Sequence, residues 1–366
     1  MKKYLFISIL LILTFIVVQN ISKKEDIKIG LVAGLSGKYS SLGHDILNGT
    51  LLAFDEINYN INGKKVEIIR KDDKQNDDEA LQSIKFFEKE GINLIIGNAT
   101  SSMTNISLSY IKDKKDFFLI SPTASSSKFS NIDDNFLRTQ IAHSTKGFNI
   151  LSNYLLERNL RNVFLVYDPV NKSYVDNYLL NFQKSFLNLG GKNFIKSEKI
   201  TNDYKSIIED INKNNIDVIV VAASALDSSN FIQYLRINGI KKSVIVSGWA
   251  KTKEFLENGG IYVNGAVFAT SYDANSENKK YLNFLKSYVK KYKTEPSVFS
   301  ARAYETAKII IQTLKKDTNI ANIKKNILFE KTFDGLQGKI VFNKFGDVDR
   351  DYFLMQVKDN SFVRIH

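Results

Sequence analysis

Two loops rich in small hydroxyl residues offer the clearest chemistry in this sequence. The first, 97–102, reads GNATSS after the apolar run LII, and the second, 121–126, reads SPTASS after FFLI. Ligands of α/β sheets lie at the carboxyl ends of strands, and helices that begin there present unpaired N–H groups that suit an anion. The pair of loops could therefore grip the carboxylate of a small molecule. Each loop taken singly could instead be a helix cap with no ligand.

Catalytic and metal-binding patterns are missing from the sequence. The three histidines are scattered and lack the spacing of metal ligands. The segment 34–40 loosely resembles a phosphate loop, but Val32 stands where the first glycine belongs and Tyr39 where Ser or Thr belongs. Acid pairs such as the one at 72–73 could serve acid–base chemistry, although charged turn residues are commoner. We therefore expect binding without turnover, and neither a metal nor a cofactor.

Composition limits the possible partners. The chain has 366 residues, of which 43% are hydrophobic, and Lys+Arg of 51 against Asp+Glu of 39 gives a net charge of +12. This length allows two domains. The basic residues are interleaved with acids along the chain, which favours a solvated surface over nucleic-acid binding. The absence of Cys excludes disulfides and lipid attachment through an N-terminal Cys.

The N-terminal segment has the pattern of an export signal. Lys2 and Lys3 precede the apolar stretch 4–18, and 17–22 offers no clean small-x-small cleavage site. We expect 1–22 to be a signal peptide or an uncleaved membrane anchor. We favour the anchor, which would leave the rest of the protein outside the cytoplasmic membrane.

From residue 27 onward, short apolar runs alternate with apolar residues at helical spacing. The expected strands are 27–33, 66–69, 92–96, 117–120, 163–167, 216–222, 244–246 and 265–270. The expected helices are 45–58, 77–87, 103–111, 147–158, 174–189, 228–237, 281–292 and 301–314. The alternation of strands and helices begins again after a crossing segment at 136–140. The end of the chain, 338–365, is rich in expected strands. This order predicts two α/β lobes in tandem, each with a parallel sheet.

Several of these segments resemble one known family. They are GLSGKYSSLGHDILNGTLLAFDEIN, NGKKVEIIRKDD, IIGNATSS, ISPTASS, VYDPVNKSYVDNY, GWAKTKEFLENGG, EPSVFSARAYETA and FDGLQGKIVFNKFGDV. In order and spacing the chain from residue 27 resembles the type I periplasmic (extracellular) solute-binding proteins of branched-chain amino-acid ABC transporters. The resemblance implies two Rossmann-like lobes that are joined by a hinge of three strands and close on a ligand. It places 27–141 and 272–329 in lobe 1, and 142–271 and 330–366 in lobe 2.

The resemblance also implies a ligand site. The first hydroxyl loop would bind the ligand carboxylate and the second would supply backbone groups and a hydroxyl, while an aromatic ring of lobe 2 would cover the ligand. The residues that match these roles are Ser101 and Ser102, then Thr123, Ala124 and Ser125, and finally Tyr174. Tyr39 and Leu42, in the loop after the first strand, could line the same cleft.

One position departs from the pattern of the family. Its amino-acid binders carry an acid after the strand 244–246, where it pairs with the ligand ammonium, but Ala250 stands there in this chain. A buried ammonium without a partner would be costly. Either another acid, such as Asp227 or Asp273, takes this role, or the ligand is not an α-amino acid. Trp249, the only Trp in the chain, could stack on an apolar or aromatic ligand at the cleft, or could simply be a packing residue.

These observations favour an extracytoplasmic solute-binding protein of an ABC importer. It would bind a small carboxylate-bearing solute, such as an amino acid, an amide or a related organic acid, by hinge closure. Its partners would be the permease and ATPase subunits, with the N-terminal segment in the membrane. The alternative is a membrane-tethered receptor module that senses a ligand and signals to another protein. An enzyme on the same scaffold is a third possibility.

Overall fold

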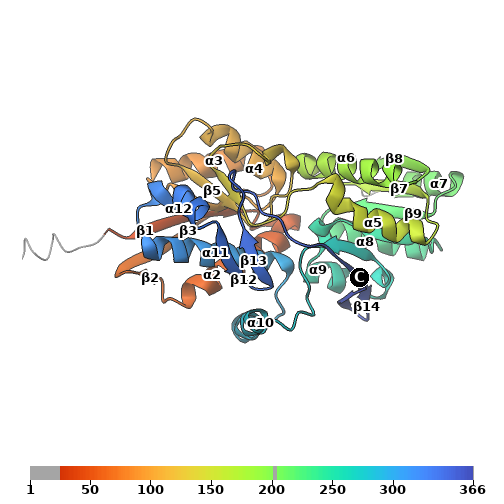
Figure 1. Ribbon diagram of the computed structural model, residues 1–366. Coiled ribbons are helices and arrows are strands. Elements are labelled where there is room, and N and C mark those ends of the chain that lie inside the picture. The colour runs from red at the N-terminus through yellow and green to blue at the C-terminus, as the bar shows by residue number, and fades with distance from the viewer. Residues whose placement is uncertain (1–24, 201–203, 366) are drawn as a thin grey trace, which may run out of the picture.

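The computed structural model describes residues 25–200 and 204–365. The expected signal peptide or anchor at 1–22 lies outside these residues. Within the described part of the chain, no helix is both long and apolar enough to cross a membrane. The protein consists of two α/β lobes that lie side by side (Figure 1).

The first lobe is built on a six-stranded sheet of order β2-β3-β1-β4-β5-β6. Its strands are β1 (Ile27–Ala33), β2 (Asn60–Ile61), β3 (Lys64–Asp72), β4 (Leu94–Gly97), β5 (Phe118–Ser121) and β6 (Phe136–Arg138). All neighbouring strands run parallel except β2, which forms an antiparallel hairpin with β3. The connecting helices are α2 (Ser40–Asp55), α3 (Asp77–Lys89) and α4 (Ser101–Ile111). The short, wholly buried strands β4 and β5 explain why their sequences are continuous apolar runs.

The second lobe is built on a seven-stranded sheet of order β15-β14-β11-β10-β9-β7-β8. Its strands are β7 (Asn162–Tyr167), β8 (Asn193–Lys199), β9 (Val218–Ala222), β10 (Ser243–Val246), β11 (Val267–Thr270), β14 (Phe353–Lys358) and β15 (Ser361–Arg364). Its helices are α5 (Thr145–Glu157), α6 (Lys172–Asn188), α7 (Lys205–Lys213), α8 (Ala225–Ile237) and α9 (Lys253–Gly259). The strands from β7 to β11 run parallel, and β14 and β15 add an antiparallel edge.

The chain crosses from one lobe to the other three times, at 139–144, 271–278 and 342–352, and these crossings are the three passages between the lobes. After the second passage come α10 (Lys279–Tyr292), α11 (Val298–Lys316), α12 (Ile323–Glu330) and a hairpin of β12 (Thr332–Gly335) and β13 (Gly338–Val341). α11 packs along α2 of the first lobe, and the turn of the hairpin contacts α11, because the Leu336 N–H donates to Glu305 at 2.7 Å. The two lobes with largely parallel sheets agree with the fold class expected from the sequence. The residue boundaries assigned to the lobes stay a prediction.

Some elements differ from the sequence expectation. α2 begins at Ser40 rather than near residue 45, so Leu42 lies on a helix and not in the preceding loop. The strand β8 was not expected, because its sequence NFIKSEK lacks an apolar run. Its place at the edge of the sheet, paired only with β7, explains why a polar segment can form a strand there.

Close packing of α2 on α11 depends on a glycine. A Cβ added to Gly49 would lie 2.0 Å from the backbone oxygen of Ser300, far inside van der Waals contact. The two helix backbones therefore approach each other more closely at this point than any side chain would allow.

We expect Gly49→Ala to destabilise the protein, although Ala is normally favoured over Gly inside a helix by about 1 kcal/mol. Forcing α2 and α11 apart should cost about 1–3 kcal/mol in the free energy of unfolding, which urea denaturation would measure. Gly34→Ala is the control, because a Cβ there would lie 3.5 Å from its nearest neighbour, an oxygen of Asp73. A Gly49→Ala variant as stable as the wild type would contradict the helix contact.

Candidate ligand-binding cleft

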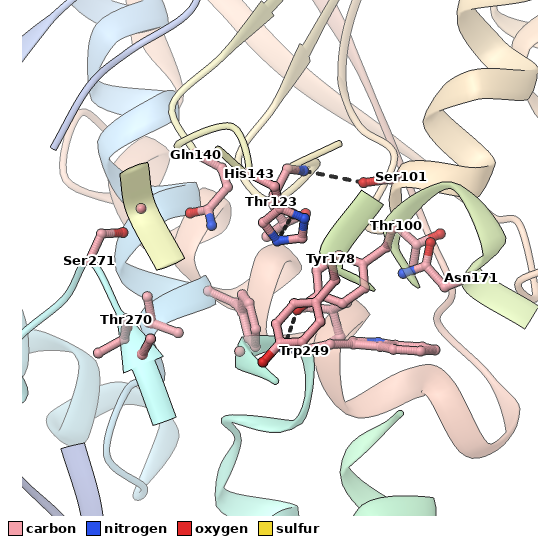
Figure 2. A pocket seen from close by; sticks show the side chains of 18 of the residues that line it. Thr100, Ser101, Thr123, Gln140, His143, Asn171, Tyr178, Trp249, Thr270 and Ser271 are labelled. Carbon is pink, nitrogen blue, oxygen red and sulfur yellow. Dashed lines mark hydrogen bonds between the residues drawn. The ribbon is translucent and has the colours of Figure 1, made fainter. Parts of the chain in front are cut away.

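A cavity lies between the two lobes, where the carboxyl ends of their strands face each other. It contains about 830 Å³ of space that no atom fills, including solvent at its open side. Its polar lining residues are Thr100, Ser101, Thr123, Ser125, Gln140, His143, Asn171, Thr270 and Ser271. Its apolar and aromatic lining includes Leu42, Ala99, Phe148, Tyr174, Tyr178, Trp249, Val298, Phe299 and Tyr352. Figure 2 shows Gln140, Thr270 and Ser271 on one side of the pocket, Thr100 and Asn171 on the other, and His143 between them.

The first hydroxyl loop leads into α4. Thr100 is the N-cap of this helix, and its side chain accepts a hydrogen bond from the Met103 N–H at 3.4 Å. Ser101 follows with its Oγ accepting from the N–H groups of Ser125 and Ser126, each at 3.2 Å. No acceptor for the Ser101 O–H lies among the described residues, so this hydroxyl is free to donate to a ligand.

The second hydroxyl loop is held to the first by its own side chains. Thr123 Oγ1 donates to the carbonyl of Ala99 at 2.6 Å. Ser125 Oγ lies 3.3 Å from His143 Nε2, within hydrogen-bonding distance. Ala124 is fully buried behind the cavity, and its N–H donates to Ser121 Oγ at 3.0 Å. The structure therefore brings Thr123 and Ser125 to the cavity, while Ala124 lies outside its lining.

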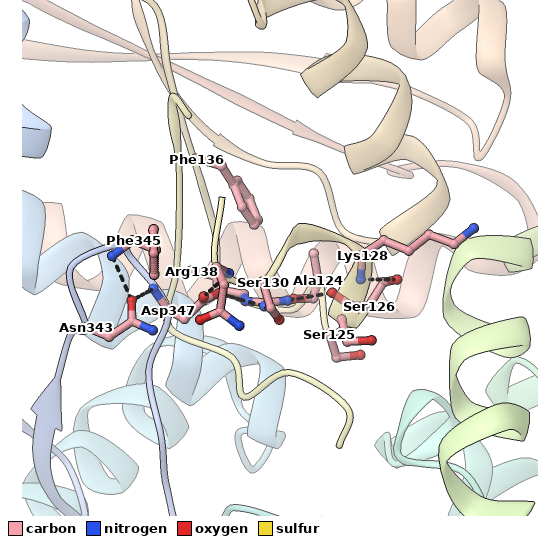
Figure 3. A network of polar contacts seen from close by, with 12 residues as sticks. Ala124, Ser125, Ser126, Lys128, Ser130, Phe136, Arg138, Asn343, Phe345 and Asp347 are labelled. Atoms are coloured by element: carbon pink, nitrogen blue, oxygen red, sulfur yellow. Dashed lines mark hydrogen bonds and ion pairs between the residues drawn. The ribbon is translucent and has the colours of Figure 1, made fainter. Parts of the chain in front are cut away.

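A buried arginine fixes the backbone of the second loop (Figure 3). Arg138, at the end of β6, has no exposed surface, and its Nη1 donates to the carbonyls of Ser126 at 2.8 Å and Ala124 at 3.4 Å. Its Nη2 donates to Ser130 Oγ at 2.6 Å. Its Nε donates to Asp347 in the third passage between the lobes at 2.8 Å. Burial lowers the pKa of Arg138 and the Asp347 carboxylate opposes this shift.

Two of the expected site residues join the lobes instead of lining the cavity. Ser102 donates its N–H to Asn171 Oδ1 at 3.1 Å, and its Oγ accepts from the Ser173 N–H at 3.1 Å. Tyr39 donates its O–H to Asp168 at 3.0 Å. Because Ser102 and Tyr39 belong to the first lobe and their partners to the second, both residues hold the cleft shut in this structure.

An aromatic wall from the second lobe closes the other side of the cavity. The backbone N–H of Trp249 donates to the hydroxyl of Tyr174 at 3.3 Å, and the centres of the two side-chain rings lie 5.8 Å apart. The Trp249 ring also stacks on Tyr39 at 6.1 Å. Burial raises the pKa of Tyr174 to about 12, so its hydroxyl stays neutral. Both Tyr174 and Trp249 therefore line the cavity, as the sequence suggested.

The lining carries no Asp, Glu, Lys or Arg within the described residues. Ala250 is fully buried, and the two acids considered as substitutes lie elsewhere. Asp227 pairs with Lys38 at 3.1 Å, and Asp273 pairs with Arg364 at 3.0 Å. In the part of the chain that the structure describes, no group of His, Asp and Glu could hold a metal ion.

Beyond the two hydroxyl loops, sequence reasoning missed five polar residues of the lining. Gln140 and His143 follow β6, and Asn171 follows β7. Thr270 and Ser271 lie at the end of β11, so all five sit where the chain leaves a sheet. Their signal was the same one that identified the hydroxyl loops, a polar side chain just after a buried strand.

Comparisons with known proteins match nearly the whole chain. Residues 26–361 match the family model described as periplasmic binding protein. The Leu/Ile/Val-binding protein of Escherichia coli (strain K12) is 23% identical over 339 residues, which cover 90% of each chain. The crystal structure of the leucine-binding protein LivK from Thermotoga maritima has a TM-score of 0.85 at 19% identity, over 93% of this chain and 98% of that chain. A solute-binding protein of an ABC transporter from R. palustris, in complex with benzoate, has a TM-score of 0.83 at 18% identity, over 93% and 95% of the two chains.

These relatives carry the names of binding proteins, which confirms the expectation that the chain is not an enzyme. The solved structures share both lobes and confirm the predicted fold class. The match over residues 26–361 shows that this chain belongs to the periplasmic binding protein family.

Proposed function

We propose that this chain is the extracytoplasmic solute-binding protein of an ABC importer. It captures a small carboxylate-bearing solute between its lobes, closes about the three passages of the chain, and presents the closed form to the permease and ATPase subunits. The family match and the names of the relatives support this class of function.

The observation that carries the proposal is the composition of the cavity. Hydroxyl groups from the ends of β4 and β5 and an aromatic wall line the same cavity between the lobes. Hydroxyl groups such as that of Ser101 can donate to an anion, while the rings of Tyr174 and Trp249 suit an apolar body. A molecule with a carboxylate at one end and an apolar group at the other would satisfy both sides.

The electrostatics of the cavity favour a ligand without an ammonium group. His143 is the only His among the described lining residues, and burial lowers its pKa to about 3, so the ring is neutral at physiological pH. With no acid in the described lining, the ammonium of an α-amino acid would be buried without a counter-charge, which is costly. The benzoate-bound relative from R. palustris has this kind of ligand, a carboxylate without an amine.

Closure is supported by contacts between the lobes. Besides the contacts of Ser102 and Tyr39, the Ser127 N–H donates to Asn177 Oδ1 at 3.0 Å, and Asn177 Nδ2 donates to Ser127 Oγ at 2.6 Å. Contacts that exist only in the closed form stabilise that form, and a ligand that touches both lobes adds to them.

A panel of paired ligands tests the proposal. Leucine and 4-methylpentanoate differ only by the amino group, and benzoate adds an aromatic carboxylate. We expect 4-methylpentanoate to bind at least about tenfold more tightly than leucine, a difference of about 1.4 kcal/mol, because it buries no unpaired ammonium. Isothermal calorimetry and the rise in Tm would measure this. Tighter binding of leucine would contradict the ligand class, and failure of every carboxylate in a wider panel would contradict the proposed function.

The hydroxyl of Ser101 should contribute directly to affinity. We expect Ser101→Ala to weaken binding of the best carboxylate of the panel at least about tenfold, because a hydrogen bond to a charged group contributes about 1.5–3 kcal/mol. Calorimetry would measure the change in Kd. Ser109→Ala, at an exposed position on the same helix, is the matched control. Equal Kd values for the Ser101 and Ser109 variants would exclude Ser101 from the ligand contacts.

The neutral state of His143 should make stability depend on pH. The unfolded chain takes up a proton at its His143 as the pH falls below about 6.5, but the folded protein does so only near pH 3, so stability is lost as the pH falls through this window. When the pH is lowered from about 7 to about 5, we expect the free energy of unfolding to fall by roughly 2 kcal/mol less in the His143→Gln variant than in the wild type. Urea denaturation at each pH would show this, and parallel curves would mean that the histidine is not buried neutral.

A further inference from the structure

A second crevice lies between the lobes, and among the described residues it shares only Val298 with the lining of the ligand cavity. It contains about 1580 Å³ of unfilled space, including open solvent. Its walls come from the segment after β10, from the second passage between the lobes, from the loop between α10 and α11, and from the turn between β14 and β15.

A buried lysine whose ammonium lies against two aromatic rings lines this crevice. Lys251 is only 3% exposed, and its Nζ sits 5.6 Å from the centre of the Tyr272 ring and 5.0 Å from that of Phe362. Among the described residues it has neither an ion pair nor a hydrogen bond. Burial lowers its pKa to about 8, so most of the side chain remains protonated at neutral pH. An ammonium buried in this way is expensive unless an anion accompanies it.

Two threonine hydroxyl groups of the same crevice, besides the hydroxyl of Tyr272, also lack hydrogen-bond partners among the described residues. The oxygens Thr252 Oγ1 and Thr294 Oγ1 are buried, and neither has a hydrogen-bond partner in the described structure. Thr252 follows Lys251 in the second lobe, whereas Thr294 lies in the loop that precedes α11. Buried polar groups are nearly always hydrogen-bonded, so two unpartnered hydroxyls in the same crevice as an ammonium without an ion pair point to a missing acceptor.

The other charges near the crevice do not supply that acceptor. Asp45 lines the crevice but accepts a hydrogen bond from Ser300 Oγ at 3.2 Å, and Lys253 pairs with Glu257 at 2.8 Å. Glu295 is exposed to solvent. The charges that act on the pKa of Lys251 are Asp273, which raises it and is itself paired with Arg364, and Arg302, which lowers it.

We propose that this crevice is a second binding site, which takes a small oxyanion on Lys251, Thr252 and Thr294. The ammonium supplies the charge, and the two hydroxyls supply donors from two different segments of the lining. The anion would thus tie the segment after β10 to the loop before α11. Because Lys251 directly follows the turn Gly248–Ala250, which carries Trp249 into the ligand cavity, the two sites share one short segment of chain.

Calorimetry of the protein without any solute in the ligand cavity tests this site. We expect inorganic phosphate or sulfate, titrated in a chloride-free buffer, to bind with a Kd in the millimolar range or tighter and to raise the Tm. Formate and acetate form the second arm, which shows whether a carboxylate can replace the inorganic oxyanion. The matched variants are Lys251→Met, which removes the buried charge, and Lys253→Met, which removes an exposed charge two residues away.

Lys251→Met should weaken anion binding at least tenfold, while Lys253→Met should leave the Kd unchanged. In anion-free buffer the Lys251→Met variant should be at least as stable as the wild type, because it no longer buries an unpaired ammonium. Thr252→Val provides a milder test, with an expected loss of at least threefold, should the Lys251 variant fail to fold. No binding of any of these anions by the wild type, or equal binding by the Lys251 and Lys253 variants, would overturn the proposal. Neither result bears on the ligand of the first cavity.

Discussion

The guanidinium of Arg138 is the interaction on which the ligand cleft depends. It reaches two carbonyls of the second hydroxyl loop and the Asp347 carboxylate of the third passage between the lobes, with no exposed surface of its own. A buried charge of this kind is tolerated only when its partners are well placed, and removing one partner from a buried pair typically costs about 3–5 kcal/mol. The second loop and the hinge are therefore held in one arrangement, which lets Thr123 and Ser125 face the cavity in a fixed geometry.

Much of the fold could be predicted, because its strands and helices follow simple periodicities. The buried strands β4 and β5 are short apolar runs, and α3 begins with Asp77 and Asp78, as expected for the first turn of a helix. The strand β8 could not be found in this way, since an edge strand needs only one partner and carries no apolar run. The start of α2 was also placed too late, because its first turn has no side-chain cap to mark it.

The candidate site was only partly predictable, for a physical reason. The rule that ligands meet the ends of parallel strands led to the two hydroxyl loops. Within them the family resemblance pointed to Ser101, Thr123 and Ser125, all of which line the cavity. The same rule cannot tell which side chains face the space and which face the opposite lobe, so it did not separate Ser101 from Ser102. The pairing of Lys38 with Asp227 across the cleft is equally invisible in the sequence, because it depends on how far the lobes have closed.

The position of the single tryptophan has a practical consequence. Trp249 lies beneath Tyr39, with only 6% of its surface exposed, at the point where the two lobes meet. Opening of the cleft would separate the two rings and expose the indole to water, which would change its fluorescence emission. The unmodified chain therefore contains its own optical reporter, and stopped-flow fluorescence can follow the rate of opening and closing without a label.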